Sequence, residues 1–141
     1  MPLVLAPDVL VNASVALGEA PQRVVDRLLT MGASETAVSP WVLERTEAML
    51  RAVPTFKADA VGPHVAHISS LVTLVKPDGT FGPDAWQDAL IATAKAAGAD
   101  RILTDHPDLL EAGFVDDIEF VACESFLLEA TMPPPPPAKM P

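Results

Sequence analysis

Short apolar runs and longer segments with a helical period alternate along the whole chain. The short runs are typical of buried strands and lie at residues 3–6, 37–38, 71–75, 101–104 and 118–122. The helical segments lie at residues 9–17, 21–32, 41–51, 55–70, 84–97, 107–112 and 125–130, with Gly62-Pro63 expected to interrupt the fourth. Strands that alternate with helices predict an α/β fold, with a mainly parallel sheet of four or five strands covered by helices on both faces.

Individual residues place the ends of several helices. Ser39 is expected to cap the helix that follows it, and Gly98 to end the helix that precedes it. Asp8 separates the first apolar run from the second and can cap the first helix. Asp84 and Asp88 are expected four residues apart on one face of the helix that ends at Gly98.

The composition is that of one globular domain. The chain has 141 residues, 50% of them hydrophobic, and a mean hydropathy of +0.30. No apolar run approaches the roughly 20 residues that span a bilayer, and no basic stretch of the signal-peptide kind opens the chain. Cys123 is the only cysteine, which excludes an internal disulfide and fits a reducing compartment. These features predict a cytoplasmic protein without a membrane segment.

The net charge of −10 and the isoelectric point near 4.5 limit the ligands that the surface can attract. Such a surface repels phosphate backbones and disfavours broad electrostatic binding of nucleic acid. It does not exclude an enzyme whose acids hold a divalent cation, because the ion inverts the local charge.

Acidic side chains follow two of the predicted strands, at the edge of an open parallel sheet where ligands bind. Asp8 follows the first strand, and Asp105, His106 and Asp108 follow the strand at 101–104. Carboxylates that converge from separate elements repel each other unless a hard cation such as Mg²⁺ or Mn²⁺ lies between them. Such a site activates water and stabilises a phosphoryl transition state.

Three stretches share their order of acids and apolar residues with one known family. DALIATAKAAGADRILTDHPDLL (88–110) contains an acid-led helix, a strand that reaches a Thr, and an acidic cluster. SPWVLERTEAML (39–50) forms a Glu-bearing helix, and LVLAPDVLVNA (3–13) an opening strand and helix. Together they resemble the PIN-domain family of small metal-dependent ribonucleases, which includes the toxins of many bacterial toxin–antitoxin pairs. The likeness covers roughly residues 3–130 and implies a three-layer α/β/α domain.

The resemblance also implies a site. Its catalytic set would comprise Asp8, Glu44, Asp88, Asp105, His106 and Asp108. Of these, Asp8, Asp88 and Asp108 would hold Mg²⁺ or Mn²⁺ if the domain is active. Glu47 serves in place of Glu44 if the alignment shifts slightly.

Two central positions depart from the family pattern. Ala6 stands where the family has a metal-binding Asp, and His106 stands where it has the main Asp after the fourth strand. A spare acid lies near each of them, Asp8 and Asp105 respectively. Asp8 is thus either a helix cap or a substitute ligand, and His106 is either a ligand or general base or a hydrogen-bonded structural residue.

Other candidate residues have simpler interpretations. His64 and His67 lie three residues apart with no third metal ligand in view, which favours structural roles. Cys123 has the character of a small buried side chain. Trp41 and Trp86 are spaced as core residues, without the basic stripe that single-stranded nucleic acid needs.

The C-terminal segment differs in composition from the rest. Residues 1–130 are predicted to form the PIN-like domain and residues 131–141 a disordered proline-rich tail, because five consecutive prolines form polyproline II. Pro134, Pro137 and Lys139 have the P-x-x-P-x-basic spacing that aromatic-lined grooves recognise.

Two functions fit these observations. In the first, the nuclease site has eroded and the domain is a protein-interaction module, with the tail as a docking segment. In the second, a shifted set of carboxylates supports a Mg²⁺- or Mn²⁺-dependent ribonuclease with RNA as its substrate. The family resemblance implies a homodimer in either case.

Overall fold

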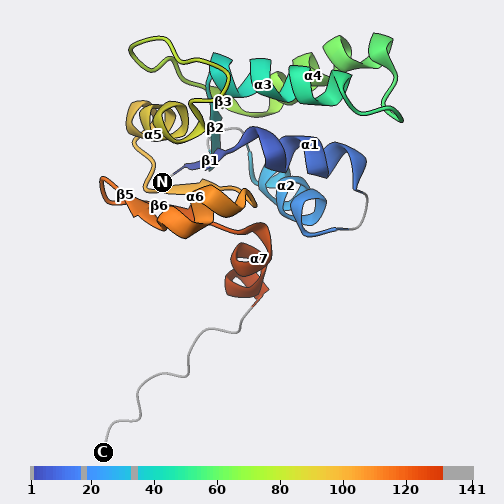
Figure 1. The fold of residues 1–141 in the computed structure, drawn as a ribbon. Helices are drawn as coiled ribbons and strands as arrows, with labels where there is room; N and C mark the ends of the chain where they lie inside the picture. The colour runs from blue at the N-terminus through green and yellow to red at the C-terminus, as the bar shows by residue number, and fades with distance from the viewer. Residues whose placement is uncertain (1, 17–18, 33–34, 132–141) are drawn as a thin grey trace, which may run out of the picture.

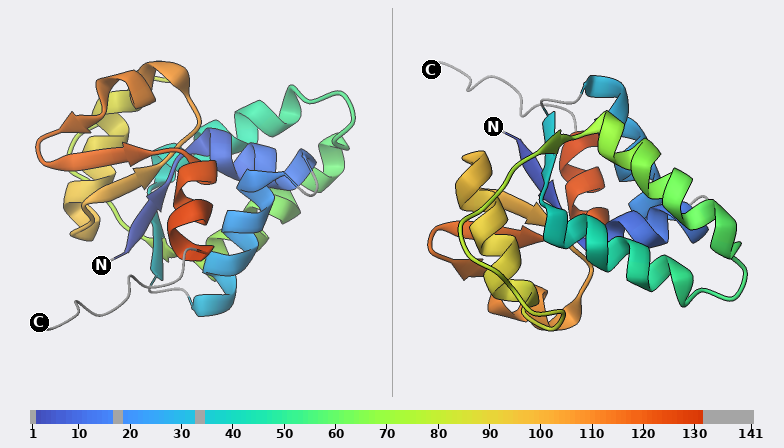
Figure 2. Two further views of the ribbon diagram at one scale, coloured as in Figure 1. Left: turned by 90° about the horizontal axis from the view of Figure 1, so that it is seen from below. Right: turned by 90° about the horizontal axis from the view of Figure 1, so that it is seen from above.

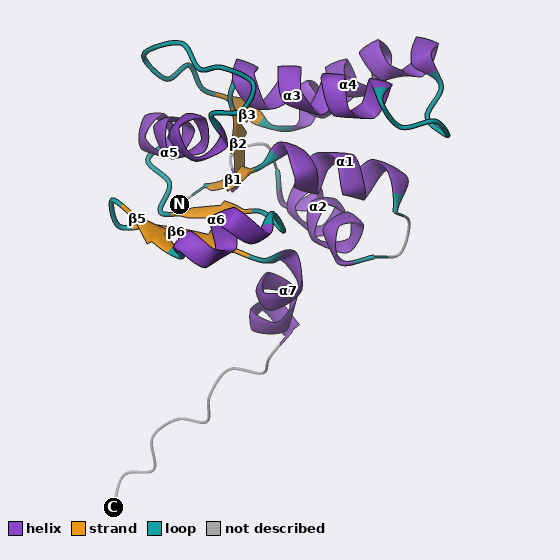
Figure 3. Ribbon diagram, in the orientation of Figure 1, coloured by secondary structure: helices purple, strands orange, loops and turns teal. Residues whose placement is uncertain are grey.

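The computed structural model describes residues 2–16, 19–32 and 35–131, which form one sheet surrounded by helices (Figure 1, Figure 3). The strands are β1 (Leu3–Leu5), β2 (Thr36–Val38), β3 (Thr73–Leu74), β4 (Arg101–Leu103), β5 (Phe114–Val115) and β6 (Ile118–Val121). The helices are α1 (Pro7–Val15), α2 (Ala20–Met31), α3 (Pro40–Arg51), α4 (Ala58–Leu71), α5 (Trp86–Ala97), α6 (Pro107–Ala112) and α7 (Cys123–Thr131).

The sheet has the order β3-β2-β1-β4-β6-β5, and its first five strands are parallel. The α/β architecture with a mainly parallel sheet is therefore confirmed. The sixth strand, β5, pairs antiparallel with β6 and was not predicted. The turn between them contains Asp116 and Asp117, both with positive φ (51° and 64°), as a tight hairpin requires. A strand of two residues is too short to show a hydrophobic period.

The core lies on both faces of the central strands, which explains why these strands are continuous apolar runs. Val4, Leu5, Ile102 and Leu103 are fully buried. Helix α5 packs on β1, β2 and β4, whereas α1, α2 and α7 cover the opposite face (Figure 2). Helix α3 packs on α1, and α4 packs on α3. The chain thus has the three layers that the sequence predicted.

The first helix begins two residues earlier than predicted, and this changes the role of Asp8. Ala6 is the N-cap and Pro7 the first helical residue, so Asp8 lies inside the first turn and its side chain caps no helix. Proline favours the first helical position because its fixed φ is already helical. The prediction that Asp8 caps this helix is wrong.

Three other boundaries differ from the prediction. Helix α4 continues through Pro63, an exposed residue in its second turn, where the proline removes only one backbone hydrogen bond of the helix. The apolar run at 71–75 predicted a strand of that length. Because α4 extends to Leu71, β3 contains only Thr73 and Leu74. Asp84 lies in a turn before α5 and does not share a helix face with Asp88.

Two expectations concern the rest of the chain. Residues 132–141, which hold the predicted tail, lie outside the described residues, and residue 131 is the last residue of α7. Within the described ranges, no helix combines the length and the apolar character that crossing a membrane requires.

The buried hydroxyl of Ser39 provides a test of this fold. Ser39 is fully buried, and its Oγ accepts hydrogen bonds from the Val42 N–H (3.4 Å) and the Thr93 hydroxyl (2.8 Å), which links α3 to α5. Ser39→Ala should lower the free energy of unfolding by about 1–2 kcal/mol, because the cap is lost. Urea denaturation measures this loss. Ser69→Ala, at an exposed hydroxyl on α4, is the matched control and should stay within about 0.5 kcal/mol of wild type.

Candidate functional site

The carboxylate of Asp8 lies where the ends of two neighbouring parallel strands meet. β1 pairs with β4, and the residues that follow both strands therefore face each other. One oxygen of Asp8 accepts a hydrogen bond from the Thr104 hydroxyl (2.9 Å), and the other accepts one from the Asp105 backbone N–H (2.7 Å). Both oxygens thus bind the segment after β4, and the side chain joins α1 to β4.

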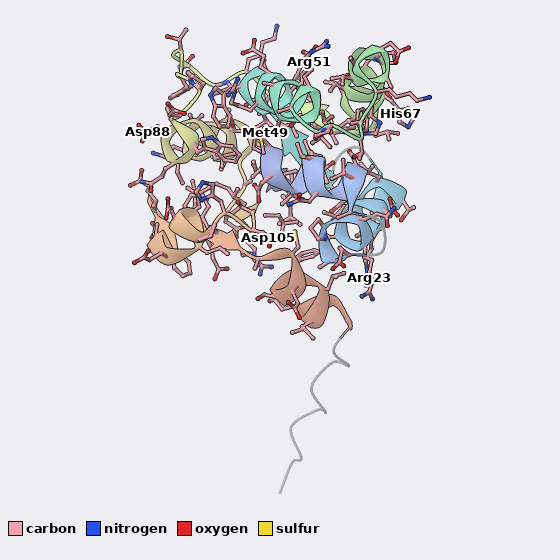
Figure 4. All side chains as sticks on the ribbon, turned by 45° about the vertical axis from the view of Figure 1, so that its right-hand side comes forward. Arg23, Met49, Arg51, His67, Asp88 and Asp105 are labelled. Carbon is pink, nitrogen blue, oxygen red and sulfur yellow. The ribbon has the colours of Figure 1, made fainter. Side chains whose placement is uncertain are left out.

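Asp105 continues this network toward the C-terminal helix. Its Oδ1 accepts a hydrogen bond from the backbone N–H of Cys123 (3.0 Å), the first residue of α7. An acid at the start of a helix satisfies a free N–H group and interacts favourably with the helix dipole. Figure 4 shows Asp105 between α1 and α7, which agrees with a role in joining these elements.

Burial sets the protonation behaviour of this network. It raises the pKa of Asp8 above 3.8, although the hydrogen bonds from Asp105 and Thr104 oppose the shift. The pKa of the Cys123 thiol is also raised, first by burial and then by the charge of Asp105. Cys123 is fully buried and remains protonated at neutral pH, so the prediction that it is a small buried side chain is confirmed.

His106 has a structural contact on each side. Its Nδ1 accepts a hydrogen bond from the Asp108 N–H (3.3 Å), and the residue is the N-cap of α6. Its ring lies against Trp86, with 5.3 Å between ring centroids. Trp86 in turn meets the edge of Trp41 at 5.6 Å, and the Trp41 indole N–H donates to the Gly82 carbonyl (2.9 Å). These rings form an aromatic row, which we define as Trp41, Trp86 and His106.

The remaining predicted acids lie apart from this network. Glu44 is exposed on α3 and lines a pocket with Trp41. Asp88 is exposed in the first turn of α5, and it lies apart from Asp105 in Figure 4. Asp108 is exposed in the first turn of α6. Glu47, the alternative to Glu44, forms an ion pair with Arg51 (2.7 Å).

These donors do not fit a divalent metal. Among residues 2–16, 19–32 and 35–131, no three His, Cys, Asp or Glu side chains are grouped closely enough to hold one. The predicted ligands Asp8, Asp88 and Asp108 are therefore not brought together. Both oxygens of Asp8 and one of Asp105 already bind protein N–H or O–H groups. Ala6 is fully buried and offers no donor side chain.

The histidines on α4 make protein contacts in a separate small pocket. His64 Nε2 lies 2.7 Å from the Ser14 hydroxyl of α1, and its ring lies 5.3 Å from that of Phe56. Burial lowers the pKa of His64, and the nearby His67 lowers it further. These contacts support the structural role that the sequence suggested for His64.

The sequence analysis missed the aromatic row. Trp41 lies in the first turn of the helix after β2, and Trp86 begins α5. The tendency of ligands to bind beyond strand ends placed His106 at this edge from the sequence, and it applies equally to Trp41. Nothing in the local sequence pairs Trp86 with either of them.

The fold is that of a PIN-like α/β/α domain, and known structures agree. A chain of VapBC2 from Rickettsia felis, solved with a DNA fragment from its promoter, aligns with a TM-score of 0.60 at 12% identity, covering 86% of this chain and 98% of that one. VapC20 of Mycobacterium tuberculosis, a sarcin-ricin loop cleaving toxin, aligns with a TM-score of 0.57 at 16% identity, covering 83% and 98%. No protein-family model and no curated protein sequence matches the chain. At these identities the likeness establishes the fold alone.

The raised pKa of Asp8 predicts a pH dependence of stability. Because the folded pKa lies above the unfolded value, the native state binds more protons just above pH 3.8, and its stability falls as pH rises through that window. Asp8→Asn removes this fall. The free energy of unfolding of the variant minus that of wild type should therefore increase from pH 3 upward and then level off. Urea denaturation from pH 3 to 7 measures the difference.

A matched control separates this effect from a general change of charge. Asp78→Asn removes an exposed carboxylate in the turn before α5, and its difference from wild type should show no comparable rise. A pH-independent difference for Asp8→Asn would contradict the assignment of the raised pKa to this carboxylate.

Proposed function

We propose that this chain is a PIN-like domain that acts as a protein-interaction module, and that an internal hydrogen-bond network replaces the carboxylate cage of the metal-dependent nucleases. The observation that carries the proposal is the double engagement of Asp8 by Thr104 and Asp105. Asp8 is the acid that would supply a metal ligand in place of Ala6, and each of its two oxygens already accepts a hydrogen bond from the protein.

Energetics support this interpretation. A metal at this site would have to share both oxygens of Asp8 with charge-assisted hydrogen bonds, which are stronger than neutral ones and occupy one lone pair of each oxygen. Mg²⁺ also gives up its water reluctantly and demands near-ideal octahedral geometry from the one or two carboxylates that hold it. With Asp88 and Asp108 exposed on separate helices, too little negative charge converges to offset the dehydration of the ion.

The aromatic row adds a second argument. His106 takes the position of the family's main Asp, and its ring packs against Trp86. A carboxylate at this position would give way to an aromatic ring that packs on a second ring at the sheet edge. An edge of this chemistry is suited to a protein surface rather than to a phosphate backbone, in agreement with the net charge of −10.

A partner protein is also in keeping with the structural neighbours. One of them was solved as part of VapBC2 on promoter DNA, and the other is described as a toxin that cleaves the sarcin-ricin loop. For this chain we propose the protein partnership without RNA cleavage. Pro134, Pro137 and Lys139 remain the proposed docking residues of the tail.

Metal titration tests the loss of the site. Wild-type protein should give no sub-millimolar Mn²⁺ isotherm at neutral pH, whereas Ala6→Asp with His106→Asp should raise the affinity by about tenfold or more, because two carboxylates join the strand ends. Isothermal titration calorimetry measures both. Ala6→Asn with His106→Asn is the control, since it matches the size of the new side chains without their charge.

The alternative function gives a different result. A sub-millimolar isotherm for wild type that Asp88→Asn abolishes, together with metal-dependent cleavage of single-stranded RNA, would replace this proposal by an active ribonuclease. An unchanged isotherm for the double Asp variant would show that geometry as well as residue type has been lost.

A further inference from the structure

A pocket of about 310 Å³ lies between the start of α3 and the loop that follows β3. Its apolar lining includes Pro40, Trp41, Pro77 and Phe81. Trp41 is largely buried, and the hydrogen bond from its indole to Gly82 fixes the ring in place. The pocket therefore offers a rigid wall of flat rings, which loses little entropy when a ligand docks.

The polar groups of the pocket complement a polyproline segment. Such a segment has no proline N–H groups but presents carbonyl oxygens to solvent. Lys76 and Thr80 lie in the pocket, are exposed, and can donate hydrogen bonds to those carbonyls. Aromatic and proline side chains bind proline rings by face-to-face contact, as in the general recognition of P-x-x-P segments.

Glu44 supplies a negative charge that can pair with the basic residue of a P-x-x-P-x-basic segment. It is an exposed acid in the pocket lining, and no ion pair of Glu44 occurs within the described part of the chain. In residues 132–141, Lys139 follows Pro134 and Pro137 at the spacing of P-x-x-P-x-basic motifs. The chain thus carries both an aromatic pocket with an acid and a proline segment with a base.

The position of α7 favours docking between two molecules over docking within one. In Figure 1, α7 lies at the bottom of the molecule and runs away from the sheet, whereas α3 and the loop after β3 lie at the top. Ten residues of polyproline II reach at most about 31 Å. To reach its own pocket, the segment would have to turn back along α7 and pass the whole sheet.

We infer that residues 132–141 of one molecule dock in the pocket of Trp41, Phe81 and Glu44 on a second copy of this chain, with Lys139 paired to Glu44. This inference deepens the proposed interaction role by naming the partner. It does not depend on the loss of metal binding, so the metal isotherm and the experiment below can fail independently.

Sedimentation velocity of the full-length chain over the micromolar range is the test, at 0.15 M salt so that repulsion between two chains of charge −10 is screened. Wild type should self-associate, and deletion of residues 132–141 should abolish the association without lowering the melting temperature. Glu44→Lys and Lys139→Glu should each weaken it by about tenfold, because a rim attraction becomes a repulsion. The two changes combined should restore it.

A matched variant and a competitor sharpen the test. Glu111→Lys makes the same charge change at an exposed position of α6, away from the pocket, and should leave association unchanged. The synthetic peptide TMPPPPPAKMP in excess should dissociate the complex and alter the fluorescence of Trp41 and Trp86, the only two tryptophans.

Three results would overturn the inference. The first is a wild-type chain that stays monomeric throughout. The second is association that requires residues 132–141 but is unaffected by Glu44→Lys, which would place the docking site elsewhere. The third is a monomer whose tryptophan fluorescence changes on deletion of residues 132–141, which would mean docking within one molecule.

Discussion

The rest of the structure depends on the hydrogen bonds that the Asp8 carboxylate accepts from Thr104 and Asp105. Parallel strands that are distant in sequence meet at one sheet edge, and there the backbone N–H groups after each strand lose their ladder partners. A buried N–H without a partner is costly. Asp8, in α1, supplies the acceptor for the segment after β4. Asp105 in turn accepts a hydrogen bond from the N–H of Cys123, the first residue of α7. Two carboxylates thus link α1, the segment after β4 and the C-terminal helix.

The same constraint limits the chemistry at this edge. A carboxylate that accepts N–H and O–H groups can also coordinate a cation, but the hydrogen bonds then fix its orientation and leave only its remaining lone pairs for the cation. The raised pKa of Asp8 shows that burial penalises its charge even with two donors in place. A neighbouring carboxylate at Ala6 would add repulsion unless a cation entered with it, so the small apolar residue there is compatible with the network.

The sequence predicted the layers and most of the elements, because buried strands and amphipathic helices have strong periods. It failed where tertiary contacts decide the outcome. Asp8 has the residue type of a helix cap, yet the helix starts at Pro7, two residues earlier than predicted, and the Asp8 side chain accepts a hydrogen bond from Thr104 instead. β5 forms only because two residues adopt left-handed backbone angles in a hairpin turn. For the site, the positions of the acids along the chain were informative, but their orientation was not, since helix faces set where Asp88 and Asp108 point.

Glu44 lines an open pocket, whereas both oxygens of Asp8 accept hydrogen bonds from the protein. This difference has a physical cause. Glu44 is exposed on α3 and lines a pocket, outside the hydrogen-bond network of Asp8 and Asp105. It stays available to a mobile cationic group such as a lysine side chain, which can approach from solvent without displacing a structural hydrogen bond. A divalent metal needs several fixed oxygens, whereas an ammonium group needs only one carboxylate beside an apolar wall. Trp41 and Phe81 would provide that wall in the inferred complex, whereas no three His, Cys, Asp or Glu side chains of the described residues are grouped as a metal site.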